Sequence, residues 1–284
     1  MSKSAMKDKI CIVTGSNSGI GRETALALTA MGGTVVAVVR NPELGKEACE
    51  AIVAETGNES IDMMLCDLSS MSEIRRFAEE FKSNYSRLDV LINNAGAVFS
   101  KREVTSDGFE RTLAVNYLAP FLLTHELLPL LKASAPSRVI NLSSGMTQNA
   151  ELNLDDLQSE SSYKSRKVYS HAKLLVEMFT YELARRLDNT GVSVNAVHPG
   201  FVATNLGRSS GSLSSRIMFG MMKPFQLTPK EGAKTSIYLA TSPEVEGITG
   251  KCFKKKMEVE TSEVSHDVTS QKQLWDATTD LLRL

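Results

Sequence analysis

Short apolar runs and longer segments of helical periodicity alternate along most of the chain. The apolar runs are four to six residues long and are dominated by Val, Ile and Leu. Runs that are mainly continuous, and do not alternate with polar residues, are typical of strands covered on both faces. They lie at residues 10–13, 34–39, 61–65, 88–92, 138–142 and 192–197.

Between these runs, apolar residues recur with the spacing of one helix face. The pattern predicts helices over residues 19–31, 42–55, 72–85, 108–132, 169–187 and 229–240. Strand and helix repeated in this order predict right-handed crossovers and an α/β fold of the Rossmann type. We therefore expect a single domain over residues 1–284, with a doubly wound parallel sheet and helices on both of its faces. Residues 201–227 are the least regular part.

Composition excludes several function classes. The chain has 284 residues, 42% hydrophobic residues and a net charge of −1, which argues against a general nucleic-acid binder. Its four cysteines are far apart with no CxxC pair, so neither a disulfide framework nor a metal site is expected. The polar start lacks the apolar core of a signal peptide, and no apolar run of about 18 residues spans a bilayer. We expect a soluble, cytoplasmic protein.

A glycine-rich loop follows the first predicted strand and opens the first predicted helix. Glycines allow a sharp turn and close approach to a pyrophosphate, while the helix N-terminus supplies free N–H groups and partial positive charge. The spacing is Gly-x-x-x-Gly-x-Gly after Thr14. A tight turn without a ligand is the alternative, but the strand–loop–helix context favours cofactor binding. The predicted contacts are Gly15, Ser16, Asn17, Ser18, Gly19, Ile20 and Gly21.

This spacing resembles that of the short-chain dehydrogenase/reductase family, whose members use a nicotinamide cofactor. An acidic residue ending the second strand would bind the ribose hydroxyl of NAD and repel a phosphate. Arg40 stands there instead, with no carboxylate until Glu43, and Arg22 lies just inside the first helix. Arginine suits a phosphate in geometry and charge, so we expect NADP(H). Solvated surface charges are the alternative for both arginines.

Two further segments follow predicted strands and so lie at the same end of the sheet, where open parallel sheets bind ligands. Asp67 and Leu68 come after the third strand, where the carboxylate can bond the adenine or cap a helix. Asn94, Ala95 and Gly96 come after the fourth. All five are predicted cofactor contacts.

Tyr169 and Lys173 lie four residues apart, which places them on one helix face. A phenol has a pKa of about 10, and a nearby ammonium lowers it, so that the tyrosine can exchange a proton with an alcohol or carbonyl oxygen. A second YxxxK, Tyr163 with Lys167, lies in a Ser-rich charged stretch without an apolar face. Because only a packed helix holds such a pair rigidly, we assign the catalytic roles to Tyr169 and Lys173, and both are also expected to contact the cofactor.

The resemblance implies further roles. It assigns Ser144, with Ser143 as the fallback, to the substrate oxygen; the alternative is a turn serine. Asn116 matches the asparagine that holds a water linked to the lysine, unless it is a core asparagine with its polar groups satisfied. Pro199, Gly200, Val202 and Thr204 match the turn beside the nicotinamide.

The resemblance covers about residues 8–284 and is strongest to the retinol-dehydrogenase-like group. The segments that carry it are Cys66-Asp-Leu-Ser-Ser70, Asp107-Gly-Phe-Glu110, Leu154-Asp-Asp-Leu157, Gly250-Lys-Cys-Phe253 and Leu274-Trp275. It implies an NADP(H)-dependent oxidoreductase that interconverts a carbonyl and an alcohol on a lipophilic, retinoid-like substrate, and a homodimer or homotetramer.

A substrate lid is expected at about residues 201–227. Its Met- and Phe-rich part, residues 214–225, suits an apolar ligand, the protein core or a membrane surface. Two other functions are compatible with the same motifs: an NADPH-dependent double-bond reductase of the protochlorophyllide type, and a non-catalytic NADP-binding sensor.

Overall fold

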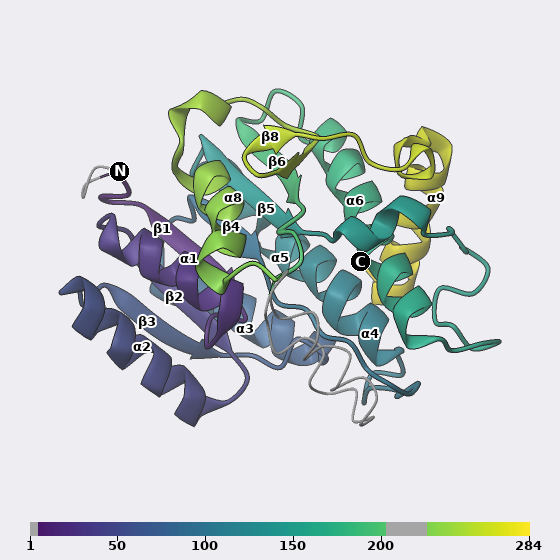
Figure 1. The fold of residues 1–284 in the computed structure, drawn as a ribbon, viewed down its shortest axis with the longest axis horizontal. Coiled ribbons are helices and arrows are strands. Elements are labelled where there is room, and N and C mark those ends of the chain that lie inside the picture. The colour runs from purple at the N-terminus through teal and green to yellow at the C-terminus, as the bar shows by residue number, and fades with distance from the viewer. Residues whose placement is uncertain (1–4, 203–225) are drawn as a thin grey trace.

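The computed structural model describes residues 5–202 and 226–284. Within them, one sheet of eight strands runs in the order β3-β2-β1-β4-β5-β6-β7-β8 (Figure 1). The strands β1 to β7 are parallel to their neighbours, and only β8 runs antiparallel, against β7. The strands are β1 Ile10–Thr14, β2 Thr34–Val39, β3 Ile61–Leu65, β4 Val90–Asn93, β5 Ser137–Leu142, β6 Val192–Val197, β7 Lys251–Lys254 and β8 Met257–Glu258. The predicted doubly wound fold is confirmed.

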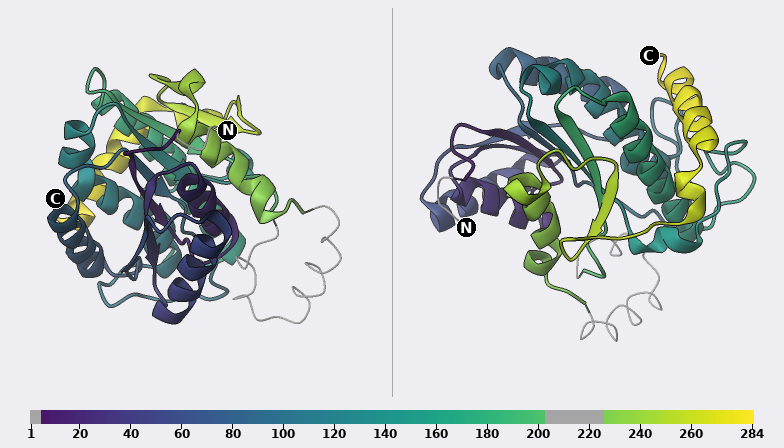
Figure 2. Two further views of the ribbon diagram at one scale, coloured as in Figure 1. Left: turned by 90° about the vertical axis from the view of Figure 1, so that its left-hand side faces the viewer. Right: turned by 90° about the horizontal axis from the view of Figure 1, so that it is seen from above.

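Helices cover both faces of this sheet (Figures 1 and 2). One face packs under α1 Gly19–Ala30, α2 Pro42–Thr56 and α8 Pro229–Thr241. The other packs under α3 Met71–Asn84, α4 Arg111–Leu113, α5 Ala119–Ala133, α6 Ser165–Arg186 and α9 Val268–Leu282. Strand β1 shows the consequence, because Ile12 belongs to one core while Cys11 and Val13 belong to the other. Two covered faces explain why the strands are apolar without alternation.

Local capping explains several helix boundaries. Asn41 caps α2 by accepting the N–H of Leu44 at 2.8 Å, and Ser70 caps α3 by accepting that of Glu73. A reciprocal capping box between Thr228 and Glu231 begins α8. These side chains satisfy N–H groups that have no partner within a helix.

The predicted helix over residues 108–132 is wrong in its start and in its regularity. Helical structure begins at Arg111, and residues Ala114–Leu118 form a π-helical turn between α4 and α5. Pro120, which follows this turn, has no N–H to donate to the carbonyl of Asn116 four residues earlier. Such turns are often found at functional sites.

The span Arg111–Ala133 is long and apolar enough to cross a membrane, but 67% of its most apolar window is buried inside the protein. Phe121 contacts the rings of Phe179 and Trp275, at centroid distances of 5.0 and 4.8 Å. Its apolar character is therefore explained by its place in the core between the sheet, α6 and α9.

Sequence periodicity missed the C-terminal elements and misplaced one helix start. Strands β7 and β8 have four and two residues, too short for a periodic signal. Helix α9 packs on α6, and the hydroxyl of its Thr278 lies 2.7 Å from that of Tyr117 in the π-helical turn. Helix α6 begins at Ser165, so Tyr169 lies in its second turn and does not open it.

Asp89, directly before β4, ties this strand to the start of β1. Its buried carboxylate accepts hydrogen bonds from the backbone N–H of Ile10, from Lys9 Nζ and from Arg87 Nε, each at 2.9 Å. Burial by itself raises the pKa of Asp89, but these hydrogen bonds outweigh it and the pKa lies below its ordinary 3.8.

We expect Asp89→Asn to lower the free energy of unfolding at pH 7 by about 2 kcal/mol, because charge-assisted hydrogen bonds are lost. A depressed carboxyl pKa stabilises the fold above the unfolded-state value, and this stabilisation is lost as pH falls through the folded value. Urea unfolding between pH 7 and pH 3 should therefore show a smaller pH dependence in the variant. Equal pH dependence in both proteins would contradict the assignment.

Candidate active site

The glycine-rich loop has the backbone shape that its residues predict. Gly15 and Gly19 have φ values of 67° and 59°, a region that favours glycine. Gly21 is needed for space instead, because a Cβ there would lie 2.3 Å from the carbonyl oxygen of Gly15 and 2.4 Å from Nδ2 of Asn94. The first turn of α1 therefore lies so close to its neighbouring loops that only glycine fits at this position.

Thr14 fastens this loop to the one after β4. Its buried hydroxyl accepts the backbone N–H groups of Asn94 and Ala95, both at 2.9 Å. In return, Nδ2 of Asn94 donates to the carbonyl of Thr14 at 2.7 Å. The structure thus brings together two predicted cofactor segments that are about 80 residues apart in sequence, and Gly96 follows in the second of them.

The start of α1 fits an anionic group. Ser18 occupies the N-cap position without a side-chain cap hydrogen bond in the described part of the chain, and the first turn has no acidic residue. The hydroxyl of Ser16 is buried and has no hydrogen-bond partner among the described residues. By contrast, α2, α3 and α8 are capped by their own side chains. A phosphate would satisfy both the free N–H groups and the unpaired hydroxyl; Asn17 lies between them.

The two predicted phosphate-binding arginines differ in their surroundings. Arg40 is exposed directly after β2, and no ion pair of its side chain occurs within residues 5–202 and 226–284. Arg22 forms ion pairs with Glu23, at 3.2 Å, and with Glu55 of α2. Arg40 is therefore the freer cation, and Arg22 would have to exchange a carboxylate for a phosphate.

The loop after β3 contributes a turn and an apolar contact. Oδ1 of Asp67 accepts both the backbone N–H and the hydroxyl of Ser69, at 2.9 and 2.8 Å. The helix cap is Ser70, so Asp67 shapes the turn and does not cap α3. Leu68 packs against the core and Ile20 of α1 is buried on the opposite face. A role of Asp67 at the adenine remains a prediction.

Tyr169, Ser144 and Lys173 meet at the carboxyl end of β5. The hydroxyl of Ser144 faces the phenol of Tyr169 closely enough to lower its pKa. Lys173 Nζ donates to the carbonyl of Leu142 at 2.8 Å and lies 5.9 Å from the centre of the Tyr169 ring. One turn of α6 thus aligns the phenol and the ammonium, and the strand end supplies the serine.

The choice between the two serines is made by their neighbours. Ser143 is buried and donates to Oε1 of Glu177 at 2.6 Å. Ser144 is half-buried, and its hydroxyl faces Tyr169 while accepting the N–H of Met146 at 3.2 Å. The geometry favours Ser144 for the substrate oxygen, with its catalytic role still a prediction.

Burial dominates the protonation of this pair. It raises the pKa of Tyr169 to about 12, although the hydrogen bond from Ser144 lowers it. Burial also lowers the pKa of Lys173 to about 8, against the opposing influence of Glu177. The expectation that Lys173 lowers the tyrosine pKa is therefore not met in this state, since the ammonium is directed to the Leu142 carbonyl.

The second YxxxK does not form a pair. Tyr163 precedes α6, and its hydroxyl bonds the carbonyl of Phe99 and the hydroxyl of Thr112, at 3.0 and 2.9 Å. Lys167 is 72% exposed and lies 3.8 Å from Glu151. The phenol and the ammonium are thus engaged with different partners, as the lack of an apolar face predicts.

Asn116 lies in the π-helical turn and is fully buried. Its Nδ2 donates to the carbonyls of Ala97 and Thr112, both at 2.8 Å, and its Oδ1 accepts the N–H of Ala97 at 3.2 Å. The side chain is therefore fully used in holding the loop after β4. If Asn116 takes part in a proton path, we expect its backbone carbonyl to do so. This carbonyl receives no hydrogen bond from residue 120, because that residue is a proline without an N–H.

The loop after β6 carries the remaining predicted contacts. Gly200 has a φ of 86°, and a Cβ there would lie 2.8 Å from Leu227. Val202 forms a bridge with Leu227 and packs near Gly232 of α8. Pro199 lies between His198 and Gly200 at the same end of the sheet. Thr204 and residues 214–225 of the predicted lid lie outside the described residues.

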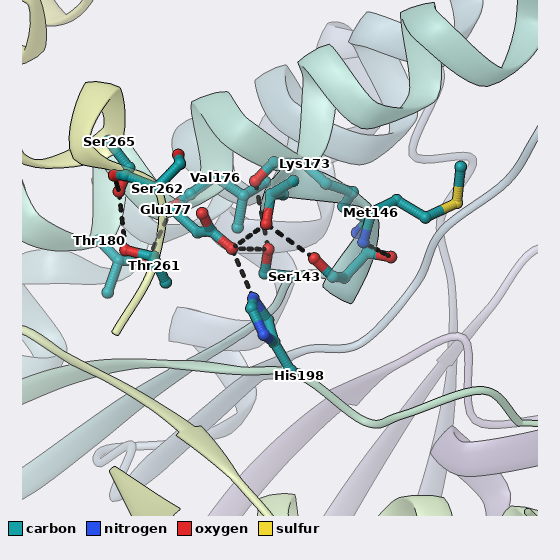
Figure 3. A network of polar contacts seen from close by, with 12 residues as sticks. Ser143, Met146, Lys173, Val176, Glu177, Thr180, His198, Thr261, Ser262 and Ser265 are labelled. Carbon is teal, nitrogen blue, oxygen red and sulfur yellow. Dashed lines mark hydrogen bonds and ion pairs between the residues drawn. The ribbon is translucent and has the colours of Figure 1, made fainter. Parts of the chain in front are cut away.

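A buried carboxylate was missed by the sequence analysis. Glu177 of α6 accepts hydrogen bonds from Ser143, Thr147 and His198 (Figure 3). A sequence signal was available, since one Glu interrupts the apolar stretch Leu174-Leu-Val-Glu-Met-Phe179 four residues after Lys173. A fully buried ionisable residue needs a hydrogen-bond or ion-pair partner.

Taken together, these groups can bind a dinucleotide along the strand ends and exchange a proton with an oxygen beside it. The glycine loop and the uncapped α1 suit the pyrophosphate, and Arg40 suits a further phosphate. Tyr169 offers a phenol for such a proton exchange, and the hydroxyl of Ser144 faces it.

Comparisons with known proteins agree with this arrangement. The model of the short chain dehydrogenase family matches residues 9–213. Retinol dehydrogenase 14 of Mus musculus is 43% identical over 95% of this chain and 85% of its own length. Retinol dehydrogenase 13 of Mus musculus is 40% identical over 100% of this chain and 86% of its own. The predicted resemblance is confirmed.

Solved structures share the fold. A protein from Mycobacterium paratuberculosis aligns with a TM-score of 0.79 and 28% identity, covering 100% of this chain and 97% of that one. The NADP active-site complex of RhlG from Pseudomonas aeruginosa aligns with a TM-score of 0.72 and 25% identity, covering 89% and 97%.

The buried ammonium of Lys173 should lower the free energy of unfolding of the protein. Its pKa in the folded state is about 8, against an ordinary 10.5. A depressed lysine pKa destabilises the folded state by about 3 kcal/mol below pH 8, and this penalty disappears between about pH 8 and 10.5. Replacing the lysine also leaves the carbonyl of Leu142 without this donor, which costs about 1 kcal/mol.

We therefore expect Lys173→Met to raise the free energy of unfolding by about 1 to 2 kcal/mol at pH 7, measured by urea denaturation. The gain should shrink as pH rises towards 10.5, because the wild-type lysine then loses its charge. A variant that is destabilised at pH 7, or whose gain grows with pH, would contradict the buried ammonium.

Proposed function

The chain belongs to the short-chain dehydrogenase family, and from this premise we propose that it is an NADP(H)-dependent oxidoreductase that interconverts a carbonyl and an alcohol on a lipophilic substrate. Oxidoreductase chemistry follows from the family. The observation that carries the reaction type is the buried phenol of Tyr169 facing Ser144, with the buried ammonium of Lys173 one helical turn away and 5.9 Å from the centre of the Tyr169 ring.

The residues divide the work by position. Ser144 holds the substrate oxygen, and Tyr169 donates a proton to it during reduction or accepts one during oxidation. Lys173 binds the nicotinamide ribose and, once its ammonium turns from Leu142 towards the tyrosine, stabilises the phenolate. Bound NADP(H) supplies or accepts the hydride.

Preference for NADP(H) over NAD(H) rests on the end of β2. Arg40 is exposed there without an ion pair in the described part of the chain, and the next acidic residue, Glu43, lies inside the first turn of α2. A carboxylate that would repel a ribose phosphate is thus missing from the end of β2 itself. The structural neighbour RhlG is described in complex with NADP.

A lipophilic substrate is supported by the rim of the site. Met146, two residues after Ser144, is 40% exposed, and Phe201, directly after Gly200, is 42% exposed. Both are large apolar side chains in the loops that follow the carboxyl ends of β5 and β6. The related proteins named retinol dehydrogenases, at about 40% identity, point to the same class of substrate.

The primary test is reduction of aldehydes of graded chain length by the purified protein, followed by loss of reduced-cofactor absorbance. Turnover that favours NADPH and rises with chain length is expected. NADPH binding without turnover of any aldehyde or ketone would overturn the proposed reaction.

Tyr169→Phe should lower kcat by at least about a hundredfold, since general acid–base catalysis contributes factors of this size. Tyr163→Phe is the matched control: it removes the phenol of the other YxxxK, whose hydroxyl bonds Phe99 and Thr112. Retained activity in Tyr169→Phe would show that another group transfers the proton.

Arg40→Asp should raise the KM for NADPH about tenfold or more and leave or improve that for NADH, because a charge-assisted bond is replaced by repulsion. Lys46→Asp makes the same change of charge on the exposed side of α2, where Lys46 lies 3.8 Å from Glu50. An unchanged cofactor preference in Arg40→Asp, or an equal change in Lys46→Asp, would refute a local phosphate contact.

A further inference from the structure

Glu177 is a fully buried carboxylate one helical turn after Lys173. A single oxygen, Oε1, accepts three hydrogen bonds: from Ser143 Oγ at 2.6 Å, Thr147 Oγ1 at 2.9 Å and His198 Nε2 at 2.6 Å (Figure 3). Three donors on one atom stabilise negative charge there.

The three donors come from both walls of the candidate active site. Ser143 precedes Ser144, and the single hydroxyl proton of Thr147 is shared between Glu177 and the carbonyl of Ser144, each 2.9 Å from Oγ1. His198 begins the loop that continues into Pro199 and Gly200, and its own N–H donates to the carbonyl of Phe253 at 2.8 Å. One carboxylate of α6 therefore links the serine wall to the predicted nicotinamide wall.

The second oxygen of Glu177 has a different environment. Oε2 is buried and has no hydrogen-bond partner among the described residues. No local donor binds this oxygen, so the charge of the carboxylate also acts at longer range in a low dielectric. Lys173, at the i−4 position on the same face of α6, is the nearest ammonium along the helix.

We propose that Glu177 is a positioning residue for the reductase site. Its Oε1 fixes the Ser143–Ser144 strand end and the His198–Gly200 loop relative to Lys173, and its negative charge keeps the buried Lys173 ammonium protonated. The second half rests on the proposed function, in which that ammonium binds the cofactor ribose. In agreement, burial lowers the pKa of Lys173 while Glu177 raises it.

Other titratable groups face this centre from each neighbouring element. Tyr169, Lys173 and Tyr181 lie on α6, His198 follows β6, and Cys252 lies on β7. Burial raises the pKa of Cys252 and of Tyr181, with Glu177 adding to both, so that the thiol and the phenol stay neutral. Lys173 and His198 are thus the groups that can carry positive charge beside Glu177.

A metal site formed by Glu177, His198 and Cys252 fits less well. Their ligand atoms lie within 4.8 Å of one another, but Oε1 and Nε2 are only 2.6 Å apart. Two ligands of one tetrahedral zinc are about 3.3 Å apart. The short separation is that of a hydrogen bond.

The test is the titration of Lys173 in the protein without cofactor. Full-length protein carrying ¹³C at the lysine ε-carbons is titrated by NMR, with Lys173→Met identifying the signal. We expect a midpoint near 8 in the wild type and one lower by about one pH unit or more in Glu177→Gln, because an opposite charge has been removed.

NADPH binding, followed by its fluorescence, gives a second measurement. Near pH 8, Glu177→Gln should bind NADPH about fivefold more weakly or worse, as its lysine is then largely neutral. Glu177→Asp keeps the charge but shortens the reach, so its lysine midpoint should stay near that of the wild type while NADPH binds at least about threefold more weakly. Glu182→Gln removes a buried carboxylate of α6 that instead pairs with Arg185 and Arg186, and it should leave both measurements unchanged.

Three results would overturn the proposal. If the pH midpoint of Lys173 is the same in folded Glu177→Gln as in the wild type, the charge of Glu177 does not keep Lys173 protonated. Wild-type NADPH affinity in Glu177→Asp would remove the role of position, and this variant decides if Glu177→Gln does not fold. Stoichiometric zinc that Glu177→Gln loses would make the cluster a metal site. Failure of the wild type to reduce any carbonyl would refute the proposed function alone, because the lysine titration does not depend on turnover.

Discussion

Covering a parallel sheet on both faces leaves its strand ends as the place where polar chemistry can gather. The interiors of β1, β2 and β4 are almost entirely apolar because they pack into two separate cores. Polar side chains at the carboxyl ends are still partly enclosed, and each needs a partner there. Thr14 with Asn94, and Ser143 with Glu177, are the solutions the chain uses.

Further buried polar side chains join the sheet to the helix layer packed on it. Nδ2 of Asn93 donates to Oδ1 of Asn141 at 2.8 Å, and Nδ2 of Asn141 donates to Thr180 of α6 at 3.0 Å. This buried chain of amides joins β4, β5 and α6 just below the candidate active site. The helix that carries Tyr169 and Lys173 is therefore placed by directional bonds as well as by apolar packing, which has no preferred register of its own.

The enclosed strand ends also hold a buried charge, the ammonium of Lys173, which does not help the protein to fold. Lys173 is 3% exposed and donates to the carbonyl of Leu142, the last residue of β5. A buried ammonium lowers stability, and sites of this kind are where function and stability oppose each other. The carboxylate one turn away moderates that conflict, which gives a physical reason for a buried Glu in a helix that is otherwise apolar at this level.

The sequence by itself determined the order of strands and helices up to α8, the glycine loop and the Tyr169–Lys173 pair, because these depend on local periodicity and on spacing within one element. It did not reveal the short β7 and β8, the π-helical turn at Asn116, or the different partners of Ser143 and Ser144. Only the tertiary structure decided these, since each depends on which groups from distant segments meet. Glu177 is the clearest case: its partners Ser143 and His198 are 34 and 21 residues away, and the folding of β5, β6 and α6 around one carboxylate brings them together.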